Sequence, residues 1–272
     1  MPKRKRGMTE KKYHKWIREG RGQGEGKEYR PWLTIHDVPS NGVVSREKSW
    51  TVGRIHHLLS RLELHYFYVL DWADSVVDIR EQYPLLPLER TIEIAEELGV
   101  SHPRDPETKE YTPITTDFFL KLKKDIDESF CARTVKPSSK LTRRTVEKFA
   151  IEKKFYDEQG IDWKVVTDKD LPKGLVHNIE WIHNAVYLDF APNDLDITFI
   201  DALAESLFTE LIITDKPLAR ITNEFDKKVG MSIGCGMFIV QHMLATKQWK
   251  TDMFTKINPS KPIQFEMNKA LV

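Results

Sequence analysis

An aspartate and a lysine at opposite ends of a predicted β-hairpin are the residues of this chain best suited to chemistry. Asp117 begins an apolar stretch, a charged turn covers 123–129, and Lys136 ends the next stretch. A carboxylate can hold a divalent cation while a lysine faces a phosphate under attack, which suits phosphodiester hydrolysis. An ordinary half-buried ion pair between Asp117 and Lys136 explains the spacing equally well.

A helix before the hairpin would contribute a second carboxylate. From residue 53 onward apolar residues recur three and four apart, which predicts one helix as far as Val69. Glu63 lies beside this apolar stripe, at the border of the buried face. The alternative is a solvated or ion-paired glutamate. His56 and His57 are expected on the exposed surface of the same helix.

These residue types match the needs of phosphodiester hydrolysis, which are a metal ion, an activated water and a positive group near the phosphate. Asp117 and Glu63 would hold Mg²⁺, which prefers oxygen ligands and keeps several waters. The main-chain carbonyl of Val135 is a further candidate ligand. Lys136 would orient the water or stabilise the developing charge.

The order of the predicted elements around the hairpin is α, β, β, β, α, β. The predicted strand at 75–85 is followed by a helical insertion and a polar loop at 88–113, and Thr116, Phe118, Leu120 and Leu122 should share the face opposite Asp117. A helix at 142–159 connects the hairpin to a strand at 161–167, so the strands it joins should be parallel. The expected fold class is α/β, with a mixed sheet flanked by helices.

Residues beyond 172 change to a mainly helical pattern. Helices are expected at 175–186, 195–214, 217–229 and 237–247, with short strands at 249–257 and 263–267. Helix, turn, helix and wing form a winged-helix-like arrangement. Because Lys247 is the only lysine or arginine in 230–247, protein docking is favoured over reading of DNA bases. We expect two domains, 1–170 with a basic arm and the catalytic core, and 171–272 for interaction.

The charge of the chain is concentrated at its beginning. Residues 1–30 hold 11 Lys or Arg against 4 Asp or Glu, although the whole chain has a net charge of only +1. Such an arm suits contacts with DNA phosphates, and the alternative is a solvated tail. The candidate DNA-binding residues are Lys3, Arg4, Lys5, Arg6 and Arg21. The glycine run at 20–26 is expected to be a flexible connector rather than a phosphate-binding loop.

The composition predicts a soluble, cytoplasmic protein. Forty per cent of the residues are hydrophobic, enough for a core, but no apolar run approaches the roughly 18 to 20 residues of a membrane span. The basic start lacks the apolar segment of a secretory signal. Cys131 and Cys235 have no metal-ligand spacing and are expected to be reduced thiols.

Several segments, in the same order, resemble the TnsA endonuclease family of heteromeric bacterial transposons. They are Glu19–Gly24, Tyr29–Thr34, Gly53–Glu63, Asp78–Pro87, Thr115–Phe118 and Val135–Pro137. The resemblance implies a restriction-endonuclease-like core of the PD-(D/E)xK class. It also implies metal-dependent catalysis by Glu63, Asp117 and Lys136. Glu152 matches a family glutamate near the active site and is a further candidate metal ligand. Thr134 stands where a member of the family has the longer glutamine, which leaves its role as a metal ligand open.

The same resemblance implies a role in cut-and-paste transposition. In that family the enzyme cuts the 5′ ends of the transposon with Mg²⁺, for which Mn²⁺ can substitute, while the transposase TnsB cuts and joins the 3′ ends. The C-terminal domain docks on the ATP-dependent regulator TnsC, so the implied partners are transposon-end DNA, TnsB and TnsC. The alternatives are a stand-alone restriction or repair nuclease, and a non-catalytic DNA- or protein-binding adaptor with a degenerate nuclease core.

Overall fold

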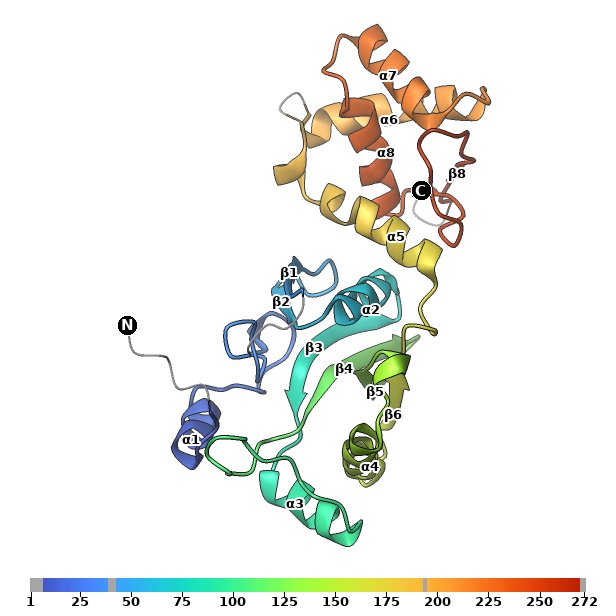
Figure 1. Ribbon diagram of the computed structural model, residues 1–272. Coiled ribbons are helices and arrows are strands. Elements are labelled where there is room, and N and C mark those ends of the chain that lie inside the picture. Colours follow the sequence, from blue (N-terminus) through green and yellow to red (C-terminus); the bar gives the residue numbers. More distant parts are fainter. Residues whose placement is uncertain (1–6, 39–42, 193–194, 270–272) are drawn as a thin grey trace. The chain divides into compact units, whose positions relative to one another are not determined.

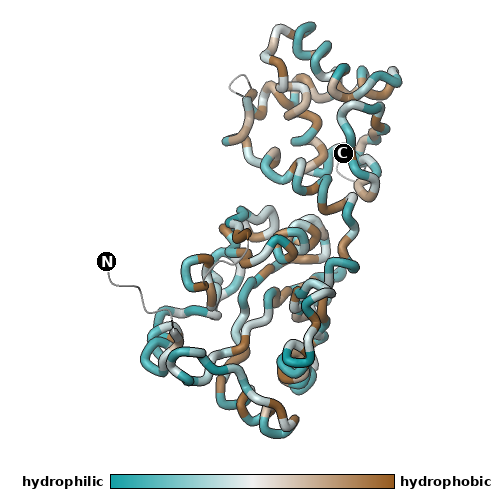
Figure 2. The backbone as a smooth tube through the Cα atoms, in the orientation of Figure 1, coloured by the Kyte–Doolittle hydropathy of each residue, from teal (hydrophilic) through white to brown (hydrophobic). Residues whose placement is uncertain are grey.

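The chain forms two compact units, residues 1–171 and 172–272. The structure is a computed structural model and describes residues 7–38, 43–192 and 195–269 (Figure 1). In both units hydrophobic and hydrophilic residues alternate along the helices (Figure 2). This is the pattern of helices that bury one face and expose the other. Within the described ranges, no helix combines the length and the apolar character needed to cross a membrane.

The first unit is built on a mixed sheet in the order β3-β4-β5-β6. Strands β3 and β4 are antiparallel. The antiparallel hairpin β4–β5 and the parallel pair β5–β6 are as the sequence predicts. The elements of this unit are α1 (Glu10–Arg18), β1 (Ser45–Lys48), β2 (Ile55–Leu58), α2 (Arg61–Trp72), β3 (Val76–Pro84), α3 (Leu88–Glu97), β4 (Thr115–Lys124), β5 (Asp127–Val135), α4 (Arg143–Asp157) and β6 (Asp162–Val166), with short 3₁₀ turns at Gly26–Glu28 and Ser138–Lys140. The expected order α, β, β, β, α, β is confirmed.

Helices α2 and α4 cover opposite faces of this sheet. Successive residues of a strand point to opposite faces. Phe118 contacts Tyr66 of α2, with ring centroids 5.6 Å apart, and its neighbour Phe119 contacts Tyr156 of α4 at 6.1 Å. On the α4 side a buried cluster includes Phe119, Ala132, Ile151 and Phe155. The sheet is therefore buried between two layers of helix.

The single helix predicted from residue 53 to Val69 is wrong in its first part. Residues Ile55–Leu58 form strand β2, which pairs with β1, and the helix begins only at Arg61. His56 and Leu58 are fully buried while Ile55 is exposed, a period of two rather than 3.6. A four-residue segment with apolar residues at both ends fits either period, and pairing with β1 selects the strand. His56 is thus a core residue and not part of a helix surface.

The glycine run at 20–26 is a packed series of turns and not the expected flexible connector. Gly22 has a φ of +75°, and a Cβ there would lie 2.3 Å from Cγ of Pro84 on β3. The amide of Gly22 donates to the carbonyl of Arg30 at 2.6 Å, and the amide of Gly26 donates to Oδ1 of Asp78 at 3.2 Å. The glycines therefore bring this segment against the beginning and the end of β3.

The second unit is mainly helical. Its elements are α5 (Lys173–Ile182), 3₁₀ turns at His183–Val186 and Leu188–Phe190, α6 (Ile197–Ile212), α7 (Leu218–Val229), α8 (Cys235–Ala245), β7 (Trp249–Lys250) and β8 (Glu266–Met267). The buried carboxylate of Asp226 on α7 accepts hydrogen bonds from the amides of Gly234 and Gly236, at 2.8 and 2.6 Å, which fixes the turn into α8. The two strands have two residues each, shorter than expected, and pair antiparallel. The winged-helix comparison stays a prediction.

Candidate active site

Side chains of β3 and β4 alternate between the two faces of the sheet, but this alternation is broken at the same level in both strands. Glu81 pairs with Phe118, which contacts α2, whereas Tyr83 pairs with Thr116, which bonds to Glu152 of α4. Residues two apart in a regular strand share a face. The expectation that Thr116 shares a face with Phe118 is therefore wrong. The residues between them, Gln82 and Asp117, are where the backbone departs from the regular pattern.

Gln82 is the β3 residue at this reversal, and it has a φ of +49°. Its side-chain nitrogen donates to Oε2 of Glu63 and to Oδ1 of Asp117, both at 3.3 Å. One amide therefore joins the two carboxylates that the sequence singles out. Gln82 is not among the residues that the sequence pattern singles out. Its only signal was its place in the Asp78–Pro87 segment, because regular alternation does not direct it toward Glu63.

Glu63 lies in the first turn of α2, where it takes part in capping the helix. Its amide donates to Oγ of Ser60 at 3.2 Å, and Oε1 accepts from the same hydroxyl at 2.9 Å. Oε2 accepts from the amide of Leu59 at 2.9 Å. The segment Ser60–Glu63 thus follows the capping-box spacing. The side chain is buried, with 7% exposed, so it is not the solvated glutamate that was the alternative.

Asp117 is held at the point where β4 and β5 separate. Regular pairing of these strands ends at Phe118 and Arg133, and Oδ2 of Asp117 accepts from the amide of Val135 at 2.6 Å. Val135 thus meets Asp117 through its amide. The amide of Lys136 donates to the carbonyl of Val166 at 2.9 Å. This hydrogen bond ties the backbone of Lys136 to the end of β6.

Glu63 and Asp117 are two buried acids that lie close together, and the pKa of each is raised. Burial raises the pKa of Glu63 to about 8, and the charge of Asp117 adds to the rise. Burial also raises the pKa of Asp117 to about 6, although the Val135 amide, Gln82 and the charge of Lys136 oppose the rise. Lys136 acts on Asp117 as a nearby charge, and the two side chains form no direct ion pair. The ordinary ion-pair interpretation of the hairpin therefore does not describe this site.

Next to Glu63 and Asp117, the side chains of Thr134 and Glu152 are joined by a hydrogen bond. The hydroxyl of Thr134 donates to Oε2 of Glu152 at 2.5 Å, and the same oxygen accepts from Thr116 at 3.2 Å and from Nε1 of Trp163 at 3.3 Å. Burial raises the pKa of Glu152 to about 8, and the charge of Asp117 adds to this, while the Thr134 hydrogen bond opposes it. The structure directs the Thr134 hydroxyl to Glu152.

The two carboxylates fit a hard divalent cation. Gln82 gives them a hydrogen bond but no positive charge, so their repulsion is left for a cation to relieve. Carboxylate oxygens are the ligands that Mg²⁺ prefers, and it completes its shell with water or backbone oxygens. Among the described residues no group of three or more His, Cys, Asp or Glu side chains is placed to hold a metal.

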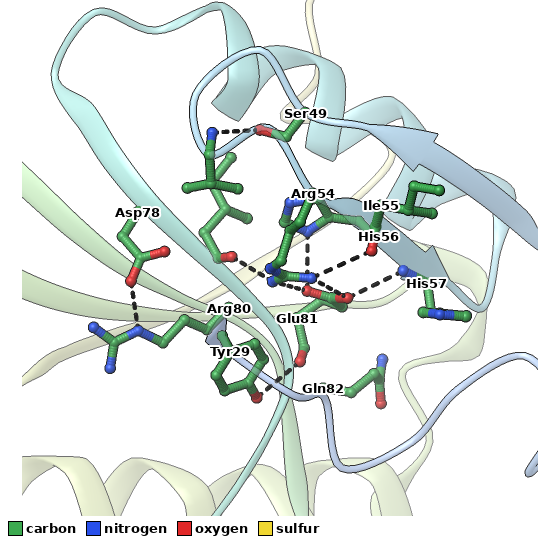
Figure 3. Close-up of polar contacts among 12 residues, drawn as sticks. Tyr29, Ser49, Arg54, Ile55, His56, His57, Asp78, Arg80, Glu81 and Gln82 are labelled. Atoms are coloured by element: carbon green, nitrogen blue, oxygen red, sulfur yellow. Dashed lines mark hydrogen bonds and ion pairs between the residues drawn. The ribbon is translucent and has the colours of Figure 1, made fainter. Parts of the chain in front are cut away.

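A second polar cluster begins one residue earlier on β3 (Figure 3). Both oxygens of Glu81 bond to the guanidinium of Arg54, and Nδ1 of His56 lies 2.9 Å from Oε2. Arg54 also donates to the carbonyl of Ile79 at 2.8 Å. Burial favours protonation of Glu81, but the charge of His56 and the bonds from Arg54 outweigh it and lower its pKa. This cluster fastens β2 to β3.

The predicted DNA-binding arm is only partly visible. Lys3, Arg4, Lys5 and Arg6 lie outside the described residues. The guanidinium of Arg21 donates to Oδ2 of Asp37 at 2.7 Å and to the carbonyl of Trp32 at 2.9 Å. It also lies over the ring of Trp16, 4.1 Å from the centroid. Arg21 thus has partners within its own chain.

The sheet, its flanking helices and the acidic cluster at the strand separation define a nuclease of the restriction-endonuclease-like class. Residues 73–168 match the family model "TnsA-like endonuclease N terminal", and residues 170–253 match "TnsA endonuclease C terminal". The chain is 38% identical over 225 residues to the Transposon Tn7 transposition protein TnsA of Escherichia coli, covering 82% of this chain and 75% of that protein. The chain belongs to the TnsA endonuclease family.

Proposed function

We propose that this chain is the Mg²⁺-dependent endonuclease subunit of a heteromeric transposase and cuts DNA at transposon 5′ ends. The observation that carries the proposal is the convergence of Glu63 and Asp117 on one amide, next to Lys136. Membership of the TnsA family supports DNA as the substrate. Mn²⁺ would substitute for Mg²⁺ because both accept octahedral oxygen ligands.

In this proposal each residue has a separate task. Glu63 and Asp117 would hold the cation, with the Val135 carbonyl as a further ligand, and the cation would neutralise phosphate charge and make its water more acidic. Lys136 stabilises the charge that builds up on the phosphate. Thr134 acts indirectly, through its hydrogen bond to Glu152. Glu152 holds a proton near neutral pH, because its pKa is raised to about 8.

Positive charge next to Lys136 supports a DNA phosphate path along the start of α4. Burial lowers the pKa of Lys148, and the charges of Arg144 and Lys136 lower it further. Arg143 and Arg144 occupy the first turn of α4, and both pair with the single carboxylate of Glu147, at 3.3 and 3.1 Å. One glutamate does not neutralise both arginines, and basic side chains there oppose the helix dipole, so a phosphate would relieve the remaining repulsion. The N-terminal arm, with Lys3 to Arg6, would add contacts with end DNA.

The decisive experiment removes Asp117 or Lys136 while keeping the hairpin. We expect Asp117→Ala and Lys136→Ala to abolish 5′-end cleavage when the partner transposase is present, with the fold intact by thermal unfolding. Asp127→Ala and Lys124→Ala, at exposed positions of the same hairpin, are matched controls and should cut normally. Cleavage that survives in either active-site variant would refute the site.

The proposed protein partners are the 3′-end transposase TnsB and, through the C-terminal unit, the ATP-dependent regulator TnsC. The turn between α7 and α8 exposes 58% of Ile233, an apolar residue suited to a protein interface. Ile233→Glu should weaken binding of the regulator and leave metal binding unchanged. Ile126→Glu, at a 92% exposed position of the β4–β5 hairpin, is the control. Equal binding by both variants would argue against docking at this turn.

Cutting by the isolated protein would favour the alternative of a stand-alone nuclease. A chain that binds neither Mg²⁺ nor Mn²⁺ in calorimetry would instead be an adaptor with a degenerate core.

A further inference from the structure

The side chain of Gln82 is locked in one orientation. The hydroxyl of Thr115 donates to its Oε1 at 3.2 Å, so the oxygen is taken and the nitrogen faces the two acids. The amide of Trp32 donates to the main-chain carbonyl of Gln82 at 3.2 Å. Only 2% of the residue is exposed. A flipped amide would turn its oxygen toward the oxygens of Glu63 and Asp117, so its two N–H groups stay directed at these oxygens.

The backbone of Gln82 is in a conformation that a glutamine adopts at a cost. Its φ of +49° lies in the left-handed region that favours glycine. Pairing of Glu81 with Phe118 and of Tyr83 with Thr116 holds the strand on both sides of it. Strained residues held by their surroundings gather at functional sites. Glycine would remove the strain here but would also remove the amide.

The amide opposes the separation of the two acids. Glu63 lies on helix α2 and Asp117 on strand β4, so the two carboxyl groups come from separate elements. A single nitrogen 3.3 Å from both oxygens holds them together across that gap. A cation that uses both groups needs them close before it binds, because rearranging them would reduce its affinity.

We propose that Gln82 is a positioning residue that assembles the metal-binding pair, holding Glu63 and Asp117 together on its side-chain nitrogen until a cation takes over. This inference rests on the proposed function of the same site. Gln82 itself makes no contact with substrate in this scheme. It belongs to the group of outer residues that orient metal ligands.

The test compares Gln82→Met with Gln82→Gly in the full chain. Methionine keeps the length of the side chain and the strain of the backbone, whereas glycine removes both. Neither residue has a side-chain amide. Titration with Mn²⁺ alone in a calorimeter should show affinity reduced roughly tenfold in both variants. Cleavage with the partner transposase should be slow at low Mg²⁺ and recover toward the wild-type rate at high Mg²⁺. Gln159→Met, which removes a glutamine amide from the end of α4, is the control for both measurements.

The outcomes separate this inference from the proposed function. Wild-type Mn²⁺ affinity in either folded Gln82 variant would overturn the inference, since neither has an amide. If Gln82→Met fails to unfold cooperatively, the unstrained Gln82→Gly variant decides alone. Loss of Mn²⁺ binding in Asp117→Ala together with normal binding in the Gln82 variants would keep the proposed site and reject only the role of Gln82. Normal Mn²⁺ binding in Asp117→Ala would reject the site itself.

Discussion

Glu81 and Gln82 are neighbours on β3, yet each belongs to a buried polar cluster of a different kind. The carboxylate of Glu81 is paired with Arg54 and His56, and its pKa is lowered. The carboxylates that meet at Gln82 receive hydrogen bonds but no direct positive partner, and burial raises the pKa of both Glu63 and Asp117. The carboxylate of one cluster has its positive partners within the folded chain, whereas the other cluster is the site that we propose for a cation.

The contrast shows how a buried acid can be assigned to structure or to chemistry. A compensated carboxylate such as Glu81 keeps its charge and ties two strands together. An uncompensated pair such as Glu63 and Asp117 reduces stability in the metal-free protein and is tolerated where a ligand will supply the missing charge. Substitutions in the two clusters should therefore change stability in opposite directions.

The largest expected effect is from removing the positive partner of Glu81. Arg54→Met should cost about 3 to 5 kcal/mol of unfolding free energy, because it leaves a buried carboxylate without its charge partner. Urea denaturation measures this loss. The double variant Arg54→Met, Glu81→Leu should recover a large part of it, because no uncompensated charge is left. A loss below about 1 kcal/mol in the single variant would contradict the assignment of Glu81 to structure.

The same isosteric substitution in both clusters should give opposite signs. Glu63→Gln should raise the stability of the metal-free protein by about 1 kcal/mol or more at pH 9, because it removes a like charge beside Asp117. Glu81→Gln should lower stability by a larger amount, because Arg54 loses its partner. Thermal unfolding in the presence of a chelator compares the two. Equal destabilisation by both would remove the distinction between the clusters.

A smaller effect concerns the pH dependence of Glu152. Its pKa is raised from 4.5 to about 8, so the folded protein keeps a proton that the unfolded chain has released. This contribution to stability is fully present below pH 4.5 and is lost as the pH rises to about 8. Glu152→Gln stays neutral and should therefore show a shallower decline of the unfolding temperature between pH 5 and 8. An unchanged decline would mean that Glu152 is already ionised at pH 5.

The smallest effect should come from a pair that is charged but exposed. On α7, Nε of Arg220 lies 2.9 Å from Oε1 of Glu224, and the two side chains are 65% and 45% exposed. Arg220→Ala should change the unfolding free energy by less than about 0.5 kcal/mol, since water screens the charges. Chemical denaturation of this variant beside Arg54→Met tests whether burial, and not pairing alone, sets the difference. A loss comparable to that of Arg54→Met would contradict this.

Local patterns predicted most of the fold but only part of the site. The strands at β3, β4, β5 and β6 follow from apolar runs between turns, and the parallel pair follows from the helix that connects β5 and β6. The segment Ile55–Leu58 has only four residues and fits a helix and a strand equally well, so its sequence does not select the strand. Asp117 and Lys136 could be found from spacing, but Gln82 could not, since a positive φ at a non-glycine residue has no signal in a single sequence.

By itself the sequence determined the order of the elements, the residue types available for phosphate chemistry and the resemblance to an endonuclease family. Tertiary structure decided which acids are compensated. Arg54 and Glu81 are far apart in the chain, as are Glu63 and Asp117, and only folding brings either pair together. The tertiary structure also decided where the alternation of side chains breaks, at Gln82, because two paired strands depart from regular geometry there at the same level. Burial and charge pairing depend on contacts across the sheet, which no local stretch of sequence contains.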